Sequence, residues 1–304
     1  MIFLHRHRNA AINIMTLDQQ LAAFPLLHIK TPSGRIAYRR AGSSLVTSAS
    51  TNTSTNTSTQ AVSTLVLLHG IGSSSSSWLY QLQAPAAQRI VLAWNAPGYT
   101  GSDPLPQDAP TAAGYAQRMW VWLDALGIER ITLAGHSLGG LIAGAAARAA
   151  PRRVERLILL APAGGYGTAP ATVREARLRE RLDNLAALGP QGMAEQRGAA
   201  MLSPQAAKDQ IAFVKQTMAQ VDPAGYTQAA RMLAQGDLAT DLAHVTCPIT
   251  VASGSADGVT PPEACRRIAT AARTTLIDLG PVGHICALEA ASAVNQLLAA
   301  GDHP

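Results

Sequence analysis

Short runs of apolar residues recur along the chain from residue 65 onward. Runs of this length that are rich in Val, Ile and Leu are typical of strands covered on both faces. They are LVLL (65–68), RIVLAW (89–94), ITLA (131–134), RLILLA (156–161), ITVAS (249–253) and TTLIDL (274–279). An earlier segment, LLHIKTPSGRIAYRRAG (26–42), predicts two short strands joined by a Pro-Ser-Gly turn.

Helical patterns separate most of these apolar runs. In YAQRMWVWLDALG, the apolar residues Tyr115, Met119, Trp122 and Leu126 fall on one stripe, and Gly127 is placed to end the helix. Strands that alternate with helices indicate an α/β protein. We therefore expect a doubly wound, mostly parallel sheet with helices on both faces.

One long interval, from 164 to about 244, shows only helical patterning, with Gly and Pro breaks at Gly189-Pro190, Pro204 and Pro223. Because ligands of open α/β sheets bind at the carboxyl ends of the strands, helices inserted here would form a cap over that site. The expected organisation is an N-terminal extension, a core domain in two parts and the cap between them. These segments span 1–25, 26–163, 164–244 (the cap) and 245–300.

The composition is that of a globular protein with one unusual segment. Of 304 residues, 47% are hydrophobic, which is enough for a large core. The stretch 43–64 is instead rich in Ser, Thr and Asn. It cannot bury enough apolar surface to fold, so we expect a flexible surface insertion.

Charge and cysteine content narrow the class of protein. The net charge is +5, but the basic residues are scattered, so no nucleic-acid partner is expected. The 3 cysteines lack C-x-x-C spacing, which argues against a disulfide scaffold or a zinc site and fits a reducing, cytoplasmic compartment. No apolar run approaches about 18 residues, so no membrane span is expected.

A serine stands between a predicted strand and a predicted helix in ITLAGHSLGGLIAGAAARAA (131–150). Gly135-His136-Ser137-Leu138-Gly139 fits G-x-S-x-G, and the strand before and helix after it make that motif informative. The turn strains the serine backbone, and side chains at the flanking glycines would collide with neighbouring elements. A dinucleotide-binding loop would need glycine at 137, and a P-loop would need G-K-S/T. Ser137 is the predicted nucleophile; a structural Gly-rich turn is the alternative.

A serine hydroxyl needs a base and an acid that orients the base. His284, in LGPVGHICALE, directly follows the last predicted strand and can reach the same sheet edge as Ser137. Asp257, in ITVASGSADGVTPPE, directly follows the preceding strand. Asp278 lies within the last strand, and Asp241 precedes a strand on the wrong edge. The predicted triad is therefore Ser137, Asp257 and His284.

Acyl transfer also needs N–H donors for the oxyanion. The segment LVLLHGIGSSSSSW ends the first long strand, and its loop can aim the N–H of Ile71 at the site, opposite the N–H of Leu138. We expect Ser73 to Ser77 to form a flexible polar wall without a nucleophile. The remaining motif residues are assigned to the geometry of this loop and of the strand–turn–helix corner around Ser137, which we call the elbow. They are His69, Gly70, Gly72, Gly135, His136 and Gly139.

Five motifs in order, HGIG, WNAPGYTGSD, GHSLGG, GSADGVTP and GHICALE, resemble those of α/β-hydrolases of the esterase, lactonase and C–C hydrolase group. The resemblance runs from about residue 26 to 300. It implies the doubly wound sheet with a helical cap, a Ser-His-Asp triad and neither cofactor nor metal. Asn95 and Thr100 replace the usual Asp and Gly of the second motif, and we expect them to tune loop packing.

The expected activity is hydrolysis of a carboxylic ester or lactone of a small, largely apolar molecule through an acyl-enzyme. Ser137 argues against haloalkane and epoxide hydrolases, which resemble this group but carry Asp at the elbow. A C–C hydrolase acting on a vinylogous diketone is the alternative, although Gly72 is followed by serines and GSADG lacks the aromatic residue usual there. A non-catalytic receptor on the same fold is a third possibility.

The cap should set substrate preference. Its arginines between Arg174 and Arg197 are candidates to meet a substrate carboxylate. Its methionines, Met193, Met201, Met218 and Met232, are candidates for flexible apolar lining and equally for helix-to-helix core.

Overall fold

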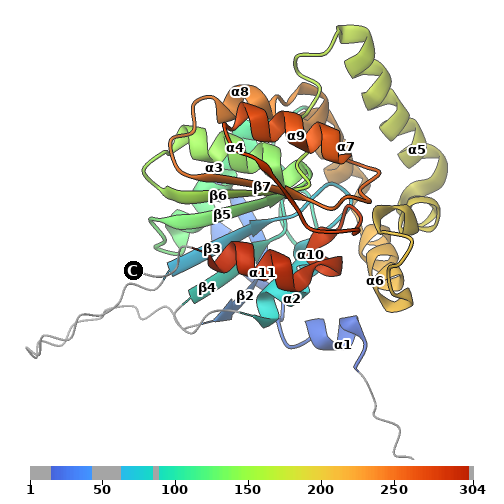
Figure 1. Ribbon diagram of the computed structural model, residues 1–304, viewed down its shortest axis with the longest axis horizontal. Coiled ribbons are helices and arrows are strands. Elements are labelled where there is room, and N and C mark those ends of the chain that lie inside the picture. Colours follow the sequence, from blue (N-terminus) through green and yellow to red (C-terminus); the bar gives the residue numbers. More distant parts are fainter. Residues whose placement is uncertain (1–14, 43–62, 85–88, 301–304) are drawn as a thin grey trace, which may run out of the picture.

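A computed structural model of the protein describes residues 15–42, 63–84 and 89–300. Nearly all of the predicted insertion at 43–64, and most of the predicted N-terminal extension, lie outside the described residues. The described part contains one mixed sheet with helices on both faces (Figure 1). The predicted α/β class with a doubly wound, mostly parallel sheet is confirmed.

The sheet has 8 strands in the order β1-β2-β4-β3-β5-β6-β7-β8. β1, β2 and β4 pair antiparallel, and every other neighbouring pair is parallel. All the predicted strands form, although the last is shortened to three residues. Their bounds are β1 Leu27–Thr31, β2 Gly34–Gly42, β3 Ser63–Leu68, β4 Arg89–Trp94, β5 Ile131–His136, β6 Val154–Leu160, β7 Ile249–Ser253 and β8 Leu276–Asp278.

Helices cover both faces of the sheet because the central strands present apolar side chains on both faces. In β6, Leu157 and Leu159 join the core that includes Met119 and Leu141, from the helices α3 (Ala112–Ala125) and α4 (Leu138–Ala149). Ile158 and Leu160 instead join a core with residues of α2 (Leu79–Gln83) and α11 (Ala291–Ala299) on the opposite face. This two-sided burial is what the near-continuous apolar runs predicted.

The remaining helices fall before, between and after the strands. Their bounds are α1 Leu17–Leu21, η1 Ser75–Trp78, α2 Leu79–Gln83, α5 Ala171–Arg197, η2 Ala199–Met201, α6 Lys208–Ala219, α7 Pro223–Gln235, α8 Leu238–Leu242, α9 Pro262–Ala271, α10 Cys286–Glu289 and α11 Ala291–Ala299. None of the helices in the described ranges is long and apolar enough to span a membrane.

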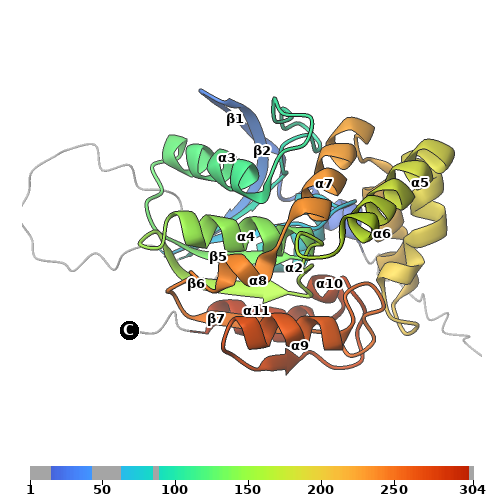
Figure 2. The same ribbon diagram turned by 90° about the horizontal axis from the view of Figure 1, so that it is seen from above.

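The chain between β6 and β7 contains helices and no strand, as its sequence pattern predicts. It contributes α5, η2, α6, α7 and α8, and α5 and α6 lie beyond one end of the sheet (Figure 2). α5 is kinked at Gly189, whose φ of 60° and ψ of 177° leave the helical region just before Pro190. The predicted Gly-Pro break therefore becomes a bend within α5.

Candidate active site

Ser137 occupies a strained corner between the last residue of β5 and the first residue of α4. Its φ of 53° and ψ of −117° lie in a region that residues with a side chain rarely adopt. The corner is held by neighbouring backbone: the Ser137 N–H donates to Leu160 O at 3.0 Å, and Ser137 O accepts from Gly140 N at 3.0 Å and Ala163 N at 3.1 Å. Strain that is fixed in this way is typical of functional sites.

The glycines beside Ser137 are explained by backbone that approaches them closely. A Cβ on Gly135 would stand 2.4 Å from Gly139 O, and a Cβ on Gly139 would stand 2.3 Å from Leu68 O. Contacts this short do not occur for real Cβ atoms, so any side chain would push α4 away from the sheet. The G-x-S-x-G spacing is thus a packing requirement of the strand–turn–helix unit.

Asp257 and His284 form a buried pair beside this corner. His284 Nδ1 lies 2.9 Å from Asp257 Oδ2, and the two side chains are 1% and 0% exposed. Asp257 Oδ1 accepts the N–H groups of Val259 at 2.8 Å and Thr260 at 2.9 Å. Burial alone would raise the pKa of Asp257, but the hydrogen bonds and charge of His284 and the hydrogen bonds of Thr260 outweigh it, and the net shift is downward. Asp257 is therefore a carboxylate at neutral pH.

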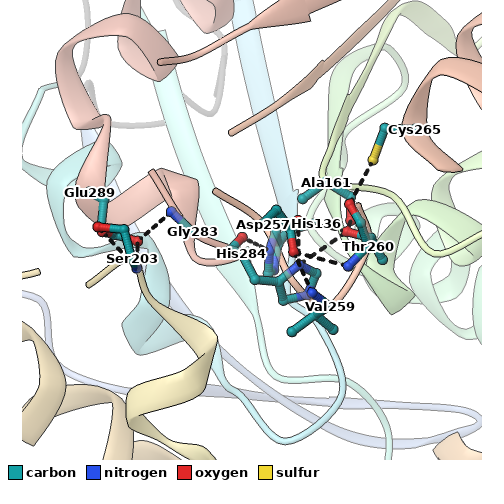
Figure 3. A network of polar contacts seen from close by, with 10 residues as sticks. All are labelled: His136, Ala161, Ser203, Asp257, Val259, Thr260, Cys265, Gly283, His284 and Glu289. Atoms are coloured by element: carbon teal, nitrogen blue, oxygen red, sulfur yellow. Dashed lines mark hydrogen bonds and ion pairs between the residues drawn. The ribbon is translucent and has the colours of Figure 1, made fainter. Parts of the chain in front are cut away.

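Thr260 contacts both members of this pair, and the sequence analysis assigned it no role. Its Oγ1 lies 2.8 Å from Asp257 Oδ2, 3.1 Å from His284 Nδ1 and 3.0 Å from Ala161 O (Figure 3). The threonine stands three residues after the acid in GSADGVTP, which is the only local signal for it. By filling the space around Oδ2, Thr260 restricts where the imidazole ring can turn.

Ser137 and His284 line one cavity of about 470 Å³, together with Ile71 and Thr260. Its volume lies within the range of small-molecule sites, about 300–1,000 Å³. Ser137 Oγ makes no hydrogen bond to any described residue. Hydrogen bonds between a nucleophile and its base are often long before substrate binds and tighten in the substrate complex.

The loop after β3 meets the elbow at the point where the sequence places oxyanion donors. Ile71 lines the cavity with Ser137, and a Cβ on Gly70 would stand 3.0 Å from Ser137 Cβ. Leu138 is the first residue of α4, so its N–H has no partner within the helix. The N–H groups of Ile71 and Leu138 make no hydrogen bond within the described part of the chain.

His69 and His136, the other two histidines of the motifs, hold the loops around the site in place. His69 Nε2 accepts the N–H of Ala96 at 3.0 Å, and Nδ1 faces Gly70 O at 2.8 Å. His136 Nε2 lies 2.8 Å from His284 O. Burial lowers the pKa of His69 to about 4 and that of His136 to about 3, where the nearby His284 contributes as well. Both rings are thus neutral at pH 7, with both nitrogens of His69 engaged.

Glu289 connects the His284 loop to the helical segment between β6 and β7, another contact that the sequence did not reveal. Its carboxylate accepts the Ser203 Oγ–H at 2.6 Å and the Ser203 N–H at 3.1 Å, and it accepts the Gly283 N–H at 2.9 Å (Figure 3). Ile285 N also donates to Met201 O at 3.1 Å. The residues on both sides of His284 are therefore anchored to η2 and to the residues that follow it.

We expect Glu289→Gln to lower kcat by about tenfold. The amide has one acceptor oxygen where the carboxylate has two, so a buried N–H of Ser203 or Gly283 would face an NH2 group, at a cost of about 1–3 kcal/mol. Steady-state kinetics and urea denaturation measure the two effects. Glu155→Gln is the control, because Glu155 pairs only with exposed Arg130 at 2.9 Å. A destabilised Glu289→Gln with an unchanged kcat would mean that Glu289 serves stability alone.

The structure contradicts the sequence prediction for the serines that follow the loop after β3. Ser75, Ser76 and Ser77 are buried and lie in η1, so the flexible polar wall predicted for Ser73 to Ser77 is wrong. The Ser75 N–H donates to Asn95 Oδ1 at 2.7 Å, and Ser76 Oγ lies 3.2 Å from Thr217 Oγ1 of α6. These serines are therefore packed between α6 and the loop that carries Asn95.

The competing acids and the remaining candidates lie outside the Asp257–His284 pair. Asp278 Oδ1 accepts the Gly280 N–H at 2.8 Å, and Asp241 pairs with Arg148 at 3.0 Å. Cys286 is fully buried, which raises the pKa of its thiol.

Met193, Met201 and Met218 line the cavity, whereas Met232 is fully buried core. No cluster of three or more metal-ligating side chains occurs among the described residues.

Comparison with known proteins shows the family to which the chain belongs. The model of the alpha/beta hydrolase family matches residues 65–297. The chain belongs to this family. It is 31% identical over 239 residues to the dihydrolipoyllysine-residue acetyltransferase component of the acetoin cleaving system of Pseudomonas putida, a match that covers 78% of this chain and 62% of that protein.

Two further similarities cover nearly the whole of the compared protein. A putative carbamate hydrolase of Klebsiella pneumoniae is 32% identical over 250 residues, which is 78% of this chain and 90% of that one. The crystal structure of the enol-lactonase from Burkholderia xenovorans superposes with a TM-score of 0.75, covering 90% of this chain and 98% of that chain at 21% identity. At that identity the similarity shows the alpha/beta hydrolase fold alone.

Proposed function

We propose that this protein is a serine hydrolase that cleaves a carboxylic ester or a lactone of a small substrate through an acyl-enzyme. The observation that carries the proposal is the strained Ser137 at a cavity that it shares with His284, whose ring is fixed by Asp257 at 2.9 Å. Alanine or glycine would pack better than serine at such a corner, so packing does not explain the hydroxyl. The name of one similar protein, the carbamate hydrolase of Klebsiella pneumoniae, supports hydrolytic chemistry.

In the first half of the reaction, Ser137 Oγ attacks the carbonyl carbon while His284 Nε2 takes its proton. Asp257 accepts the hydrogen bond from Nδ1, which leaves Nε2 as the basic nitrogen and stabilises the imidazolium cation that forms. The oxyanion of the tetrahedral intermediate accepts the N–H groups of Ile71 and Leu138. His284 then returns the proton to the leaving alcohol oxygen as the C–O bond breaks.

In the second half, water replaces the alcohol. His284 Nε2 takes a proton from water as the water oxygen attacks the acyl carbon of the ester on Ser137. The intermediate collapses, Ser137 Oγ leaves with the proton from His284, and the carboxylic acid departs. No cofactor is needed for either half.

A covalent probe tests the proposal. Native protein treated with a fluorophosphonate should gain one adduct, and mass spectrometry of the digest should place it on Ser137. Ser137→Ala and heat-denatured protein are the controls and should stay unlabelled. Absence of an adduct on native protein, or its presence on another serine, would refute the assignment.

Turnover of three substrates then separates ester or lactone hydrolysis from C–C hydrolysis. We expect 4-nitrophenyl butyrate and a δ-lactone to be hydrolysed faster than a vinylogous diketone, because the acid loop carries no aromatic residue to hold a ring-cleavage product. A higher kcat/KM on the diketone would mean that the same three residues catalyse C–C bond cleavage instead.

A further inference from the structure

Two arginines of the cap line the cavity that holds Ser137. They are Arg181 and Arg197, both from α5 and both half-buried. In the described part of the chain, neither guanidinium forms an ion pair or a hydrogen bond. Of the other arginines of α5, Arg174 donates to Gly167 O at 3.2 Å, Arg177 pairs with Glu180 at 3.2 Å, and Arg179 is exposed to solvent.

The bend in α5 brings these two arginines to one cavity. They are sixteen positions apart, which in a straight helix is about 24 Å along the axis, too far for both to meet one small molecule. Gly189, with its φ of 60°, interrupts the helix between them, and the second half of α5 turns back toward the sheet (Figure 1). Their placement on one cavity is therefore a product of the kink and not of helical spacing.

Among the described residues that line the cavity, the single carboxylate is already engaged with the residues of α8. Asp237 is the one acid among them, and its side chain caps α8 by accepting the Thr240 N–H at 3.2 Å. Arg267 also lines the cavity, but it pairs with Glu263 at 2.7 Å. Most of the remaining lining is apolar, including Met193, Met201 and Leu233. Two half-buried cations in such surroundings favour an anionic ligand, because partial burial weakens screening by water.

We infer that the substrate carries a carboxylate, remote from the bond that is cleaved, which Arg181 and Arg197 bind. This inference rests on the proposed function and adds its substrate class: an ester or lactone with an apolar body and one anionic end. A planar guanidinium matches a carboxylate through two parallel hydrogen bonds, so the pair gives orientation as well as charge recognition. The cap thereby distinguishes acidic esters from neutral esters of the same size.

The test compares charged and neutral esters matched in length. One pair carries the charge on the acyl side: 4-nitrophenyl hydrogen glutarate against 4-nitrophenyl pentanoate. The second carries it on the alcohol side: 4-carboxyphenyl acetate against 4-methylphenyl acetate. The measured quantity is the ratio of kcat/KM for the charged ester to that for its neutral partner, in wild type and in variants, at low salt.

Arg181→Gln and Arg197→Gln should each lower this ratio by about tenfold or more in at least one ester pair, because a hydrogen bond to a charged group is lost. Turnover of the neutral esters should change by less than about threefold, which shows that the variants fold and keep the catalytic residues. Arg179→Gln is the matched control: it removes the same charge from an exposed position on the same helix that does not line the cavity. Its ratio should equal that of wild type.

Failure of the inference can be told apart from failure of the proposed function. If wild type hydrolyses the esters but Arg181→Gln and Arg197→Gln leave the ratio unchanged in both pairs, the carboxylate inference is overturned and the hydrolase stands. The carboxylate inference is also overturned if Arg179→Gln lowers the ratio as much, since the effect is then one of overall charge. If wild type hydrolyses none of the esters and Ser137 takes no fluorophosphonate, the proposed function itself fails.

Discussion

Ser137→Ala is expected to lower kcat for an activated ester by on the order of 10⁴-fold or more, the size of loss seen when the nucleophile of a catalytic triad is removed. The substitution deletes the attacking oxygen and changes little else. Ser137 Oγ has no hydrogen-bond partner among the described residues, and alanine keeps the Cβ that the corner already accommodates. The thermal midpoint should therefore stay within about 2 °C of the wild-type value.

A double variant checks that the three residues act as a unit. When nucleophile and base cooperate in one step, removing both costs about as much as removing one. Ser137→Ala combined with His284→Ala should thus be no slower than Ser137→Ala alone, within about threefold. Asp257→Asn should lose on the order of 10⁴-fold, because an amide holds the wrong tautomer of the ring. Ser137→Ala that retains a tenth of the wild-type kcat would contradict the nucleophile assignment.

Gly139→Ala is expected to destabilise the folded protein by at least about 3 kcal/mol, at the upper end of what overpacking costs. Its Cβ would stand 2.3 Å from Leu68 O and 2.8 Å from His69 O. Both are backbone atoms at the end of β3, so neither can move aside as a side-chain tip can. The loss is a large part of the 5–15 kcal/mol that typically separates folded from unfolded protein.

Soluble yield and the urea midpoint measure this effect, with Gly114→Ala as the control. Gly114 lies in the first turn of α3, where a Cβ would come no closer than 3.8 Å to Thr111 Oγ1. The control should be neutral or more stable by up to about 1 kcal/mol, because alanine reduces the freedom of the unfolded chain. Equal midpoints for Gly139→Ala and wild type would show that α4 can shift without cost.

Local chemistry made the elbow and the sheet predictable from the sequence. The near-continuous apolar runs mark strands, and all of them form in the structure; β3, β4 and β5 are buried as expected, whereas the edge strand β8 is largely exposed. Gly135 and Gly139 mark the corner because only a missing side chain allows β3, β5 and α4 to meet there. The order of the strands along the chain then places Asp257 and His284 at the same edge as Ser137. These inferences use contacts within a segment or the rule that parallel strands end at one edge.

Contacts between distant segments were invisible to the same reasoning. Serines 73–77 resemble a solvated loop because nothing in that run reveals that α6 and the Asn95 loop cover it. Glu289 stands in a motif that indicates only His284 as a site residue, since the partner of Glu289, Ser203, is 86 positions away. Arg181 and Arg197 share a cavity only because α5 bends at Gly189.

The sequence by itself determined the α/β class, the strained serine corner and the acid–histidine pair, because short-range sterics and strand order specify them. Tertiary structure alone decided which residues between β6 and β7 line the cavity, how the His284 loop is anchored and which polar groups are buried. Those properties depend on how helices dock, and docking is fixed by shape complementarity over the whole surface rather than by any local pattern.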